Sequence, residues 1–179
     1  LHPLRAAPNR DELNKSRNHA LYIRYLHDSV REILTKFGTV DILWLDFSYP
    51  KPDGTGKGHD AWDAAGLYRL VRRLRPRILL NDRLDLPYTA DILTPEQNTP
   101  REGLMRNGRP AVWEACHTLS GGSWTHDREM ANLRSAEQLI ALLIDCVSKN
   151  GNMLLNVGPN ARGQLDPRIL QRLREIGDW

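Results

Sequence analysis

Three carboxylate side chains each follow a short apolar run in this chain of 179 residues. Asp46 comes after Ile-Leu-Trp-Leu, Glu96 after Leu-Thr-Pro, and Glu114 after Val-Trp, while Arg83 closely follows a fourth run, Ile-Leu-Leu. Taken alone, Asp46 could equally be a helix or loop cap, Glu96 is better read as an exposed loop residue, and Glu114 could be a buried partner of an arginine or a backbone amide. Together, at the ends of neighbouring strands, these side chains supply the kinds of functional group that acid–base and nucleophilic catalysis require.

Tryptophans accompany these acids. Trp44, Trp113 and Trp124 lie on or near the same predicted strand ends. Their flat apolar faces suit stacking against sugar rings, although filling the rim of a hydrophobic core is the alternative. Cleavage of a glycosidic bond needs two carboxyl groups facing each other across the bond, one ionised and one protonated. A nearby negative charge and an apolar wall keep the second one protonated. The combination therefore favours a site that cleaves a sugar linkage.

Helical and strand-like segments alternate along the chain and must position these residues. Apolar spacing predicts a helix over 20–37 that Gly38 ends, and helices over 61–75 and 135–149. Ser135 and Gln138 form a capping-box pattern at the start of the third. Asp166 and Pro167 open a final helix. Short apolar runs predict strands over 40–46, 78–80, 91–93, 111–115 and 153–157.

This alternation indicates an α/β fold with a parallel sheet covered by helices. An open doubly wound sheet and a (β/α)8 TIM-type barrel both fit. The barrel is favoured because polar residues follow nearly every strand, and a barrel gathers strand ends on one rim. A full barrel typically needs about 250 residues, and five strands are predicted. We therefore expect 1–179 to be one partial catalytic barrel domain holding the C-terminal strands and helices, with the opening strands absent.

Composition limits the other classes of function. The formal net charge is +3, too small to indicate a nucleic-acid partner. The arginines of 69–77 alternate with leucine and valine, which is typical of the solvated side of an amphipathic helix. No apolar run is long enough for a membrane span. Cys116 and Cys146 are expected to be buried free thiols, a single disulfide being the alternative.

Two kinds of ligand site are poorly supported. Gly54-Thr55-Gly56-Lys57 follows a strand and precedes a helix, as a phosphate-binding loop does, but Lys51 and Gly58 replace the required glycine and hydroxyl residue. A rim loop is the better interpretation. No set of histidines, cysteines and acids has the spacing of a metal site, so we expect neither metal nor cofactor.

Five motifs resemble the α-L-fucosidases of glycoside hydrolase family 29. They are VDILWLDFSYP (40–50), LLNDR (79–83), LTPEQ (93–97), Trp113-Glu114 and VSKNGNMLLNVGP (147–159). The similarity runs in order from about Tyr22 to Trp179. The first and last motifs together are quite specific, whereas LTPEQ alone is weak.

The resemblance implies a retaining hydrolase that removes terminal α-L-fucose from fucosylated oligosaccharides. Asp46 matches the nucleophile and Glu96 best matches the acid/base, with Glu114 in reserve. In this scheme the two carboxyls lie about 5–5.5 Å apart. Arg83 matches an arginine that contacts the sugar and the nucleophile region, and Trp124 an aromatic residue against the sugar's methyl group.

Trp44, Trp113 and Glu114 complete the expected substrate-binding set. The family's upstream strands bring sugar-binding histidines and a tryptophan whose motifs do not occur here. We therefore expect only part of the sugar pocket, and little activity from the isolated chain. The alternative is a catalytically incomplete carbohydrate-binding fragment.

Overall fold

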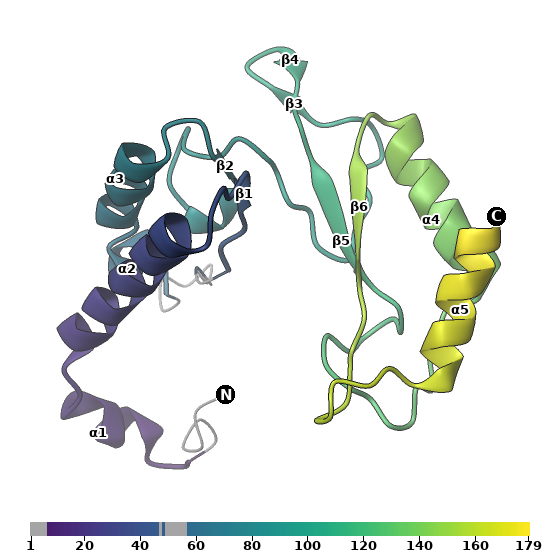
Figure 1. The fold of residues 1–179 in the computed structure, drawn as a ribbon, viewed down its shortest axis with the longest axis horizontal. Helices are drawn as coiled ribbons and strands as arrows, with labels where there is room; N and C mark the ends of the chain where they lie inside the picture. Colours follow the sequence, from purple (N-terminus) through teal and green to yellow (C-terminus); the bar gives the residue numbers. More distant parts are fainter. Residues whose placement is uncertain (1–6, 47, 49–56) are drawn as a thin grey trace. The chain divides into compact units, whose positions relative to one another are not determined.

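The computed structural model describes residues 7–46, 48 and 57–179 (Figure 1). The glycines of the rejected phosphate-loop motif at 54–56 lie outside this range. The chain divides into two compact units, residues 1–79 with 84–89 and residues 80–83 with 90–179. Asp46 and Trp44 belong to the first unit, and the other predicted site residues belong to the second.

The first unit begins with helix α1 (Arg10–Lys15) and helix α2 (His19–Lys36). Asn18 caps α2, because its side chain accepts a hydrogen bond from the Ala20 N–H at 3.1 Å. The helix ends where predicted: Phe37 is its C-cap and Gly38 follows with φ 82°, a backbone conformation that favours glycine.

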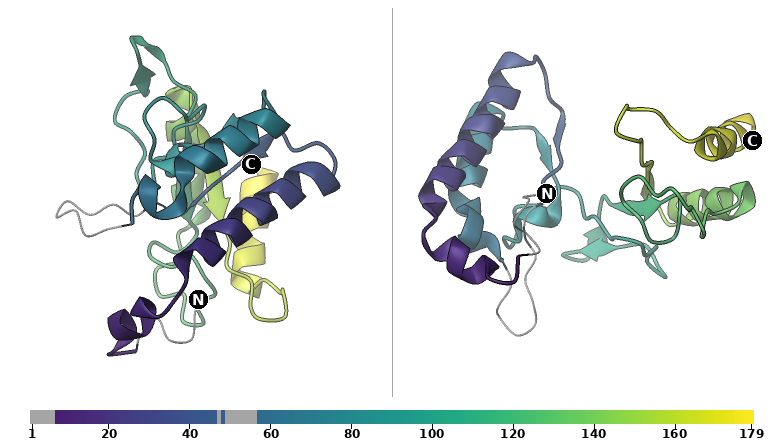
Figure 2. Two further views of the ribbon diagram at one scale, coloured as in Figure 1. Left: turned by 90° about the vertical axis from the view of Figure 1, so that its left-hand side faces the viewer. Right: turned by 90° about the horizontal axis from the view of Figure 1, so that it is seen from below.

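The helix predicted over 61–75 is interrupted. A 3-10 turn, η1 (His59–Trp62), precedes helix α3 (Ala64–Leu74), with Asp63 between them in the left-handed conformation at φ 47°. Asp63 Oδ1 accepts from the Gly66 N–H at 3.1 Å and so caps α3. Helices α2 and α3 pack side by side (Figure 2). Buried side chains of the two helices are Val30, Leu34, Ala64, Leu67, Leu70 and Val71.

The arginines of α3 and the following turn are only partly a solvated face. Arg69, Arg73 and Arg77 are exposed as predicted. Arg72 instead donates to the Ile78 carbonyl at 2.5 Å, and Arg75 donates to the Leu34 and Gly38 carbonyls, both at 3.1 Å. Two of the five cations thus tie backbone segments together.

Two short strands, β1 (Ile42–Leu43) and β2 (Leu79–Leu80), form a two-stranded sheet. The Leu79 N–H donates to the Asp41 carbonyl at 2.9 Å. Both strands lie within the predicted runs 40–46 and 78–80 but are shorter.

The second unit is built on parallel strand pairing. Strands β5 (Glu114–Thr118) and β6 (Asn152–Asn156) are parallel, with Glu114 opposite Asn152 and Thr118 opposite Asn156. Parallel bridges extend the pattern; they are Asn81–Ile92, Leu93–Trp113 and Glu96–Cys116. The expected parallel β/α arrangement is confirmed here, but the fourth strand begins three residues later than predicted.

Helices α4 (Ala136–Ser148) and α5 (Pro167–Asp178) complete the second unit. The capping box at Ser135 and Gln138 is present as predicted. Helix α4 packs on β6 and α5 packs on α4 (Figure 1). Two buried clusters result, one of Leu119, Met130, Leu139 and Ile169, the other of Trp113, Ala115 and Cys146.

A small hairpin was not expected from the sequence. Strands β3 (Met105–Arg106) and β4 (Arg109–Pro110) pair antiparallel around Asn107 and Gly108. Both turn residues have positive φ, 51° and 74°. Asn-Gly is the preferred pair for such a two-residue turn, so the signal was present in the sequence.

Within the described residues the sheets are strand pairs, and a closed barrel is not among them. Both cysteines are free and buried, as predicted. None of the described helices has the length and apolar character needed to cross a bilayer.

Candidate active site

An arginine–carboxylate cluster lies just after two neighbouring parallel segments, β2 and the segment of Ile92 and Leu93. The Arg83 guanidinium contacts Glu96, with 2.9 Å between Nη1 and Oε2. Arg83 also donates from Nε to Thr94 Oγ1 at 3.0 Å and from Nη2 to the Thr94 carbonyl at 3.2 Å. Asp82 accepts from the hydroxyl and, at 3.2 Å, from the backbone N–H of Thr94. Three separate donor groups of Arg83 are therefore used, which fixes its orientation.

The backbone on both sides of Glu96 is bonded to β5. The Cys116 N–H donates to the Pro95 carbonyl at 2.9 Å, and the Gln97 N–H donates to the Cys116 carbonyl at 2.8 Å. The Gln97 side chain adds a second attachment: Nε2 donates to Thr118 Oγ1 at 2.7 Å, and Oε1 accepts from the Thr118 N–H at 3.3 Å. Gln97 holds φ 52°, a strained value for a residue other than glycine.

This pairing determines the face on which Glu96 lies. Bridged residues of parallel strands share a face, so Glu96 lies on the Cys116 face of β5. Ala115 lies on the opposite face, where it packs with Cys146 of helix α4. The Glu96 side chain is 44% exposed and that of Arg83 is 17% exposed. The carboxylate is thus open to a ligand, while the arginine beside it is largely buried.

Asp46 lies in the first unit, three residues after β1. Its side chain is exposed, and it follows half-buried Trp44 and buried Leu45. The alternating burial of Leu43 and Leu45 shows that this segment is extended and anchored on one side. Asp46 therefore lies three residues beyond β1 rather than at the end of a strand over 40–46, and its catalytic role stays a prediction.

The structure corrects the proposed role of Trp113. Its side chain is 1% exposed and belongs to the cluster with Ala115 and Cys146. A Cβ placed on Gly151 would lie 2.2 Å from the Trp113 ring, so the ring fills the space beside that glycine. A ring used in this way has no face for a sugar. Trp113 is a core residue.

Glu114 is also placed differently from the prediction. It is the first residue of β5 rather than the residue after a strand, and it faces Asn152 at the start of β6. Barrel enzymes place catalytic groups at the carboxyl ends of strands. Glu96 bridges to Cys116, two residues further along β5 than Glu114, and which of the two glutamates is the acid/base stays a prediction.

Trp124 lies in the loop between β5 and α4 and is 39% exposed. Trp44 directly precedes Leu45 and Asp46. These positions leave both rings partly accessible, and their contacts with a sugar stay predictions.

Thr94, Gln97 and Thr118 were not anticipated from the sequence. Thr94 and Gln97 flank Pro95 and Glu96 in the LTPEQ motif, so their polar character at a strand end was a usable signal. Thr118 is fully buried, and only the pairing of distant segments reveals it as the partner of Gln97.

Two buried titratable groups, Cys146 and His117, lie in or near β5 and have shifted pKa values. Burial raises the pKa of the Cys146 thiol, and burial together with the Arg134 charge lowers the pKa of His117. His117 Nε2 lies 3.1 Å from Thr99 Oγ1. In the portion of the chain that the structure describes, no three His, Cys, Asp or Glu side chains are grouped as metal ligands.

Comparison with known proteins gives the class of the chain. The family model described as Alpha-L-fucosidase matches residues 4–179. The chain belongs to the alpha-L-fucosidase family.

Individual relatives agree. Plasma alpha-L-fucosidase of Rattus norvegicus is 29% identical over 160 residues, covering 83% of this chain and 32% of the relative. The structure of alpha-L-fucosidase isoenzyme 1 from Paenibacillus thiaminolyticus is 39% identical with a TM-score of 0.82, covering 99% of this chain and 42% of that one. The Thermotoga maritima alpha-fucosidase, solved with a mechanism-based inhibitor, is 28% identical with a TM-score of 0.66, covering 88% of this chain and 33% of that one. The chain thus spans less than half the length of these relatives.

Proposed function

We propose that this chain is the part of a (β/α)8 fucosidase barrel that carries both catalytic carboxylates, and that it cleaves terminal α-L-fucose from oligosaccharides with retention. The observation that carries this is the Glu96 cluster: an accessible carboxylate, bonded to Arg83 and held at the backbone by β5, in a chain of the alpha-L-fucosidase family. In this proposal residues 1–179 form one partial barrel domain.

In the first step a carboxylate oxygen of Asp46 attacks the anomeric carbon of fucose. The bond from that carbon to the leaving oxygen breaks, and Glu96 gives its proton to that oxygen. In the second step the Glu96 carboxylate takes a proton from water, the water oxygen bonds to the anomeric carbon, and Asp46 is released as a carboxylate. The mechanism-based inhibitor bound by the Thermotoga maritima relative agrees with a covalent route.

The Arg83–Glu96 ion pair fits the second step directly, because a guanidinium stabilises the carboxylate that must accept the proton. The first step needs Glu96 protonated. A protonated Glu96 has no charge to pair with Arg83, so in this proposal the Arg83–Glu96 contact weakens in the first step while Arg83 keeps its bonds to Thr94.

The test uses a hybrid enzyme in which residues 1–179 replace the matching segment of the Paenibacillus thiaminolyticus isoenzyme. Glu96→Ala should lower turnover of an oligosaccharide about 10²–10⁴-fold. Turnover of an aryl fucoside with an acidic leaving group should fall less. Added azide should restore this turnover and give fucosyl azide as the product, since azide needs no general base. Glu114→Ala is the matched control and should keep the first step intact.

Asp46→Gly separates catalysis from simple sugar binding. Loss of turnover with retained fucose binding supports the nucleophile assignment. Unchanged turnover in both Asp46→Gly and Glu96→Ala would refute the proposal, and fucose binding without any turnover in the unmutated hybrid would favour the binding-fragment alternative.

A further inference from the structure

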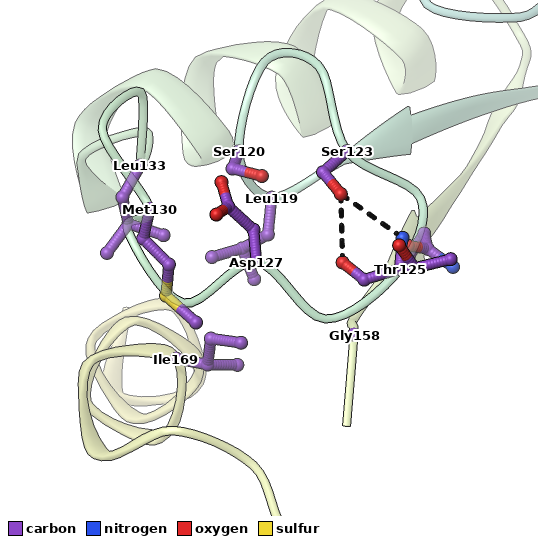
Figure 3. Close-up of a pocket in the computed structure, with 10 residues that line it drawn as sticks. Leu119, Ser120, Ser123, Thr125, Asp127, Met130, Leu133, Gly158 and Ile169 are labelled. Carbon is purple, nitrogen blue, oxygen red and sulfur yellow. Dashed lines mark hydrogen bonds between the residues drawn. The ribbon is translucent and has the colours of Figure 1, made fainter. Parts of the chain in front are cut away.

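The loop between β5 and α4 lines a half-open polar hollow of about 350 Å³ in the second unit. This volume is at the small end of ligand sites, which span about 300–1,000 Å³, and suits a ligand of one sugar ring. Most of its lining carries hydrogen-bonding side chains: Ser120, Ser123, His126, Asp127, Arg128 and Asn132. A smaller neighbouring cavity shares Ser120, Ser123 and Asp127 with it (Figure 3).

The loop is held in shape from its two ends. Ser120 and Leu133 form an antiparallel bridge, and the Gly121 N–H donates to the Asn132 carbonyl at 3.2 Å. Ser123 Oγ donates to the Thr125 carbonyl at 3.0 Å, one of the bonds drawn in Figure 3. Hydrogen bonds within the loop itself therefore fix the shape of the hollow.

Two other segments support the loop. Arg168, in the first turn of α5, donates to the Arg128 carbonyl at 3.1 Å and the Glu129 carbonyl at 3.3 Å. Its bonds to Asp166 lower the pKa of that carboxyl to about 2, so the pair stays charged over the working pH range. Gly158 lies against Thr125, where a Cβ would come within 2.6 Å of the carbonyl oxygen.

A short series of bonds links the loop that lines the hollow to the Glu96 segment. Gln97, next to Glu96, donates to Thr118 Oγ1, and Thr118 Oγ1 donates to the Ser120 carbonyl at 2.7 Å. A general acid has to face the oxygen of the departing group, so that group lies on the acid's side of the cleaved bond. A polar hollow whose loop is bonded to the segment that carries the acid is thus suited to the departing sugar.

The lining chemistry indicates a neutral, hydroxylated ligand. Asp127 offers carboxylate oxygens, and one of them, Oδ1, is oriented by the Glu129 N–H at 3.0 Å. Arg128, Asn132 and the serines can donate hydrogen bonds. Charges of both signs are present, which favours sugar hydroxyls over an anionic group.

We propose that this hollow is the subsite for the sugar to which fucose is attached, and that Asp127 and Asn132 hold its hydroxyls. The assignment rests on the proposed function for its role in catalysis, but binding of the leaving sugar can be measured without turnover.

The test is an NMR titration of the ¹⁵N-labelled chain with D-galactose, N-acetyl-D-glucosamine, L-fucose and D-glucuronate. Galactose or N-acetylglucosamine should shift the amide signals of 120–132, and Asp127→Asn should weaken that binding about tenfold, the loss expected for one charged hydrogen bond. Asp145→Asn, on helix α4 and paired with Lys149, is the matched control and should leave binding unchanged. Shifts with fucose alone, with glucuronate alone, or with none of the four sugars would each overturn the assignment.

A kinetic comparison in the hybrid keeps the two proposals separate. Asp127→Asn should lower kcat/KM for a fucosylated disaccharide about tenfold and leave that for an aryl fucoside unchanged. An equal loss on both substrates would refute the leaving-sugar role. Absence of turnover in the unmutated hybrid would instead count against the proposed function, with the titration still deciding the subsite.

Discussion

Replacing Gly151 with alanine tests whether Trp113 is a core residue or a sugar-binding one. The new Cβ would lie 2.2 Å, 2.3 Å and 2.4 Å from three carbons of the Trp113 ring. Relaxed carbon–carbon contacts are about 3.5–4.0 Å, so the ring or the backbone must shift by more than about 1 Å. The ring is enclosed by Ala115 and Cys146, at 0% exposure each, and has little space to move.

The expected cost follows from these contacts. Overpacking a well-filled core typically costs about 1–3 kcal/mol, and a clash with a rigid ring belongs at the upper end. Loss of glycine's freedom in the unfolded chain offsets about 0.4–1 kcal/mol. We therefore expect Gly151→Ala to lower the free energy of unfolding by about 2 kcal/mol, measured by urea unfolding followed by far-UV circular dichroism.

Two comparisons make the test specific. Gly177→Ala, at an exposed helical position with no neighbouring atom within 4 Å, should leave stability unchanged or raise it by up to about 1 kcal/mol. In a Trp113→Leu background the Gly151→Ala cost should shrink, because the clashing ring is gone. A Gly151→Ala protein within about 0.5 kcal/mol of the parent would refute the core assignment.

Two further changes probe β5 and its neighbours. Because the pKa of His117 is lowered from 6.5 by burial and by Arg134, the unfolded chain binds its proton more readily than the folded one, so stability should fall as the pH drops below about 6.5. His117→Gln should flatten that part of the pH dependence, and an unchanged slope in urea-unfolding measurements would contradict the reasoning. Gln97→Ala removes both side-chain bonds to Thr118 and should lower kcat of the hybrid on oligosaccharides more than Asn98→Ala does at the next, exposed position. Equal effects of these two substitutions would argue against a positioning role for Gln97.

Local patterns predicted the helices well because their causes are local. The spacing of apolar residues placed α2, and the Ser135–Gln138 pair placed the start of α4. The break at Asp63 was missed, since its left-handed backbone depends on a side-chain bond to Gly66 that apolar spacing does not report.

The register of β5 was less predictable for a different reason. His117 and Thr118 are polar but buried, and a distant segment supplies a bond to each, from Thr99 to His117 Nε2 and from Gln97 to Thr118. Apolar spacing alone therefore ended the strand too early and made Glu114 look like a strand-end acid. The same shift made Trp113 look like a rim residue, although it packs beside Gly151.

The arginine–carboxylate part of the site was easier to anticipate. Arg83 and Glu96 each follow a parallel segment, and neighbouring parallel strands bring their carboxyl ends together. Their contact at 2.9 Å agrees with that reasoning. The roles of Thr94 and Gln97 could not be predicted from spacing, since they depend on which backbone groups face them after pairing.

The central claim is that Asp46 forms the covalent bond to fucose, and trapping that bond tests it most directly. The hybrid enzyme is treated with 2-deoxy-2-fluoro-fucosyl fluoride, which forms the glycosyl-enzyme quickly and releases it slowly, and its peptides are analysed by mass spectrometry. We predict a single fluorofucosyl group on Asp46, and none in the Asp46→Asn variant. A label on Asp82 or any other residue, or no label on a hybrid that hydrolyses fucosides, would contradict the account.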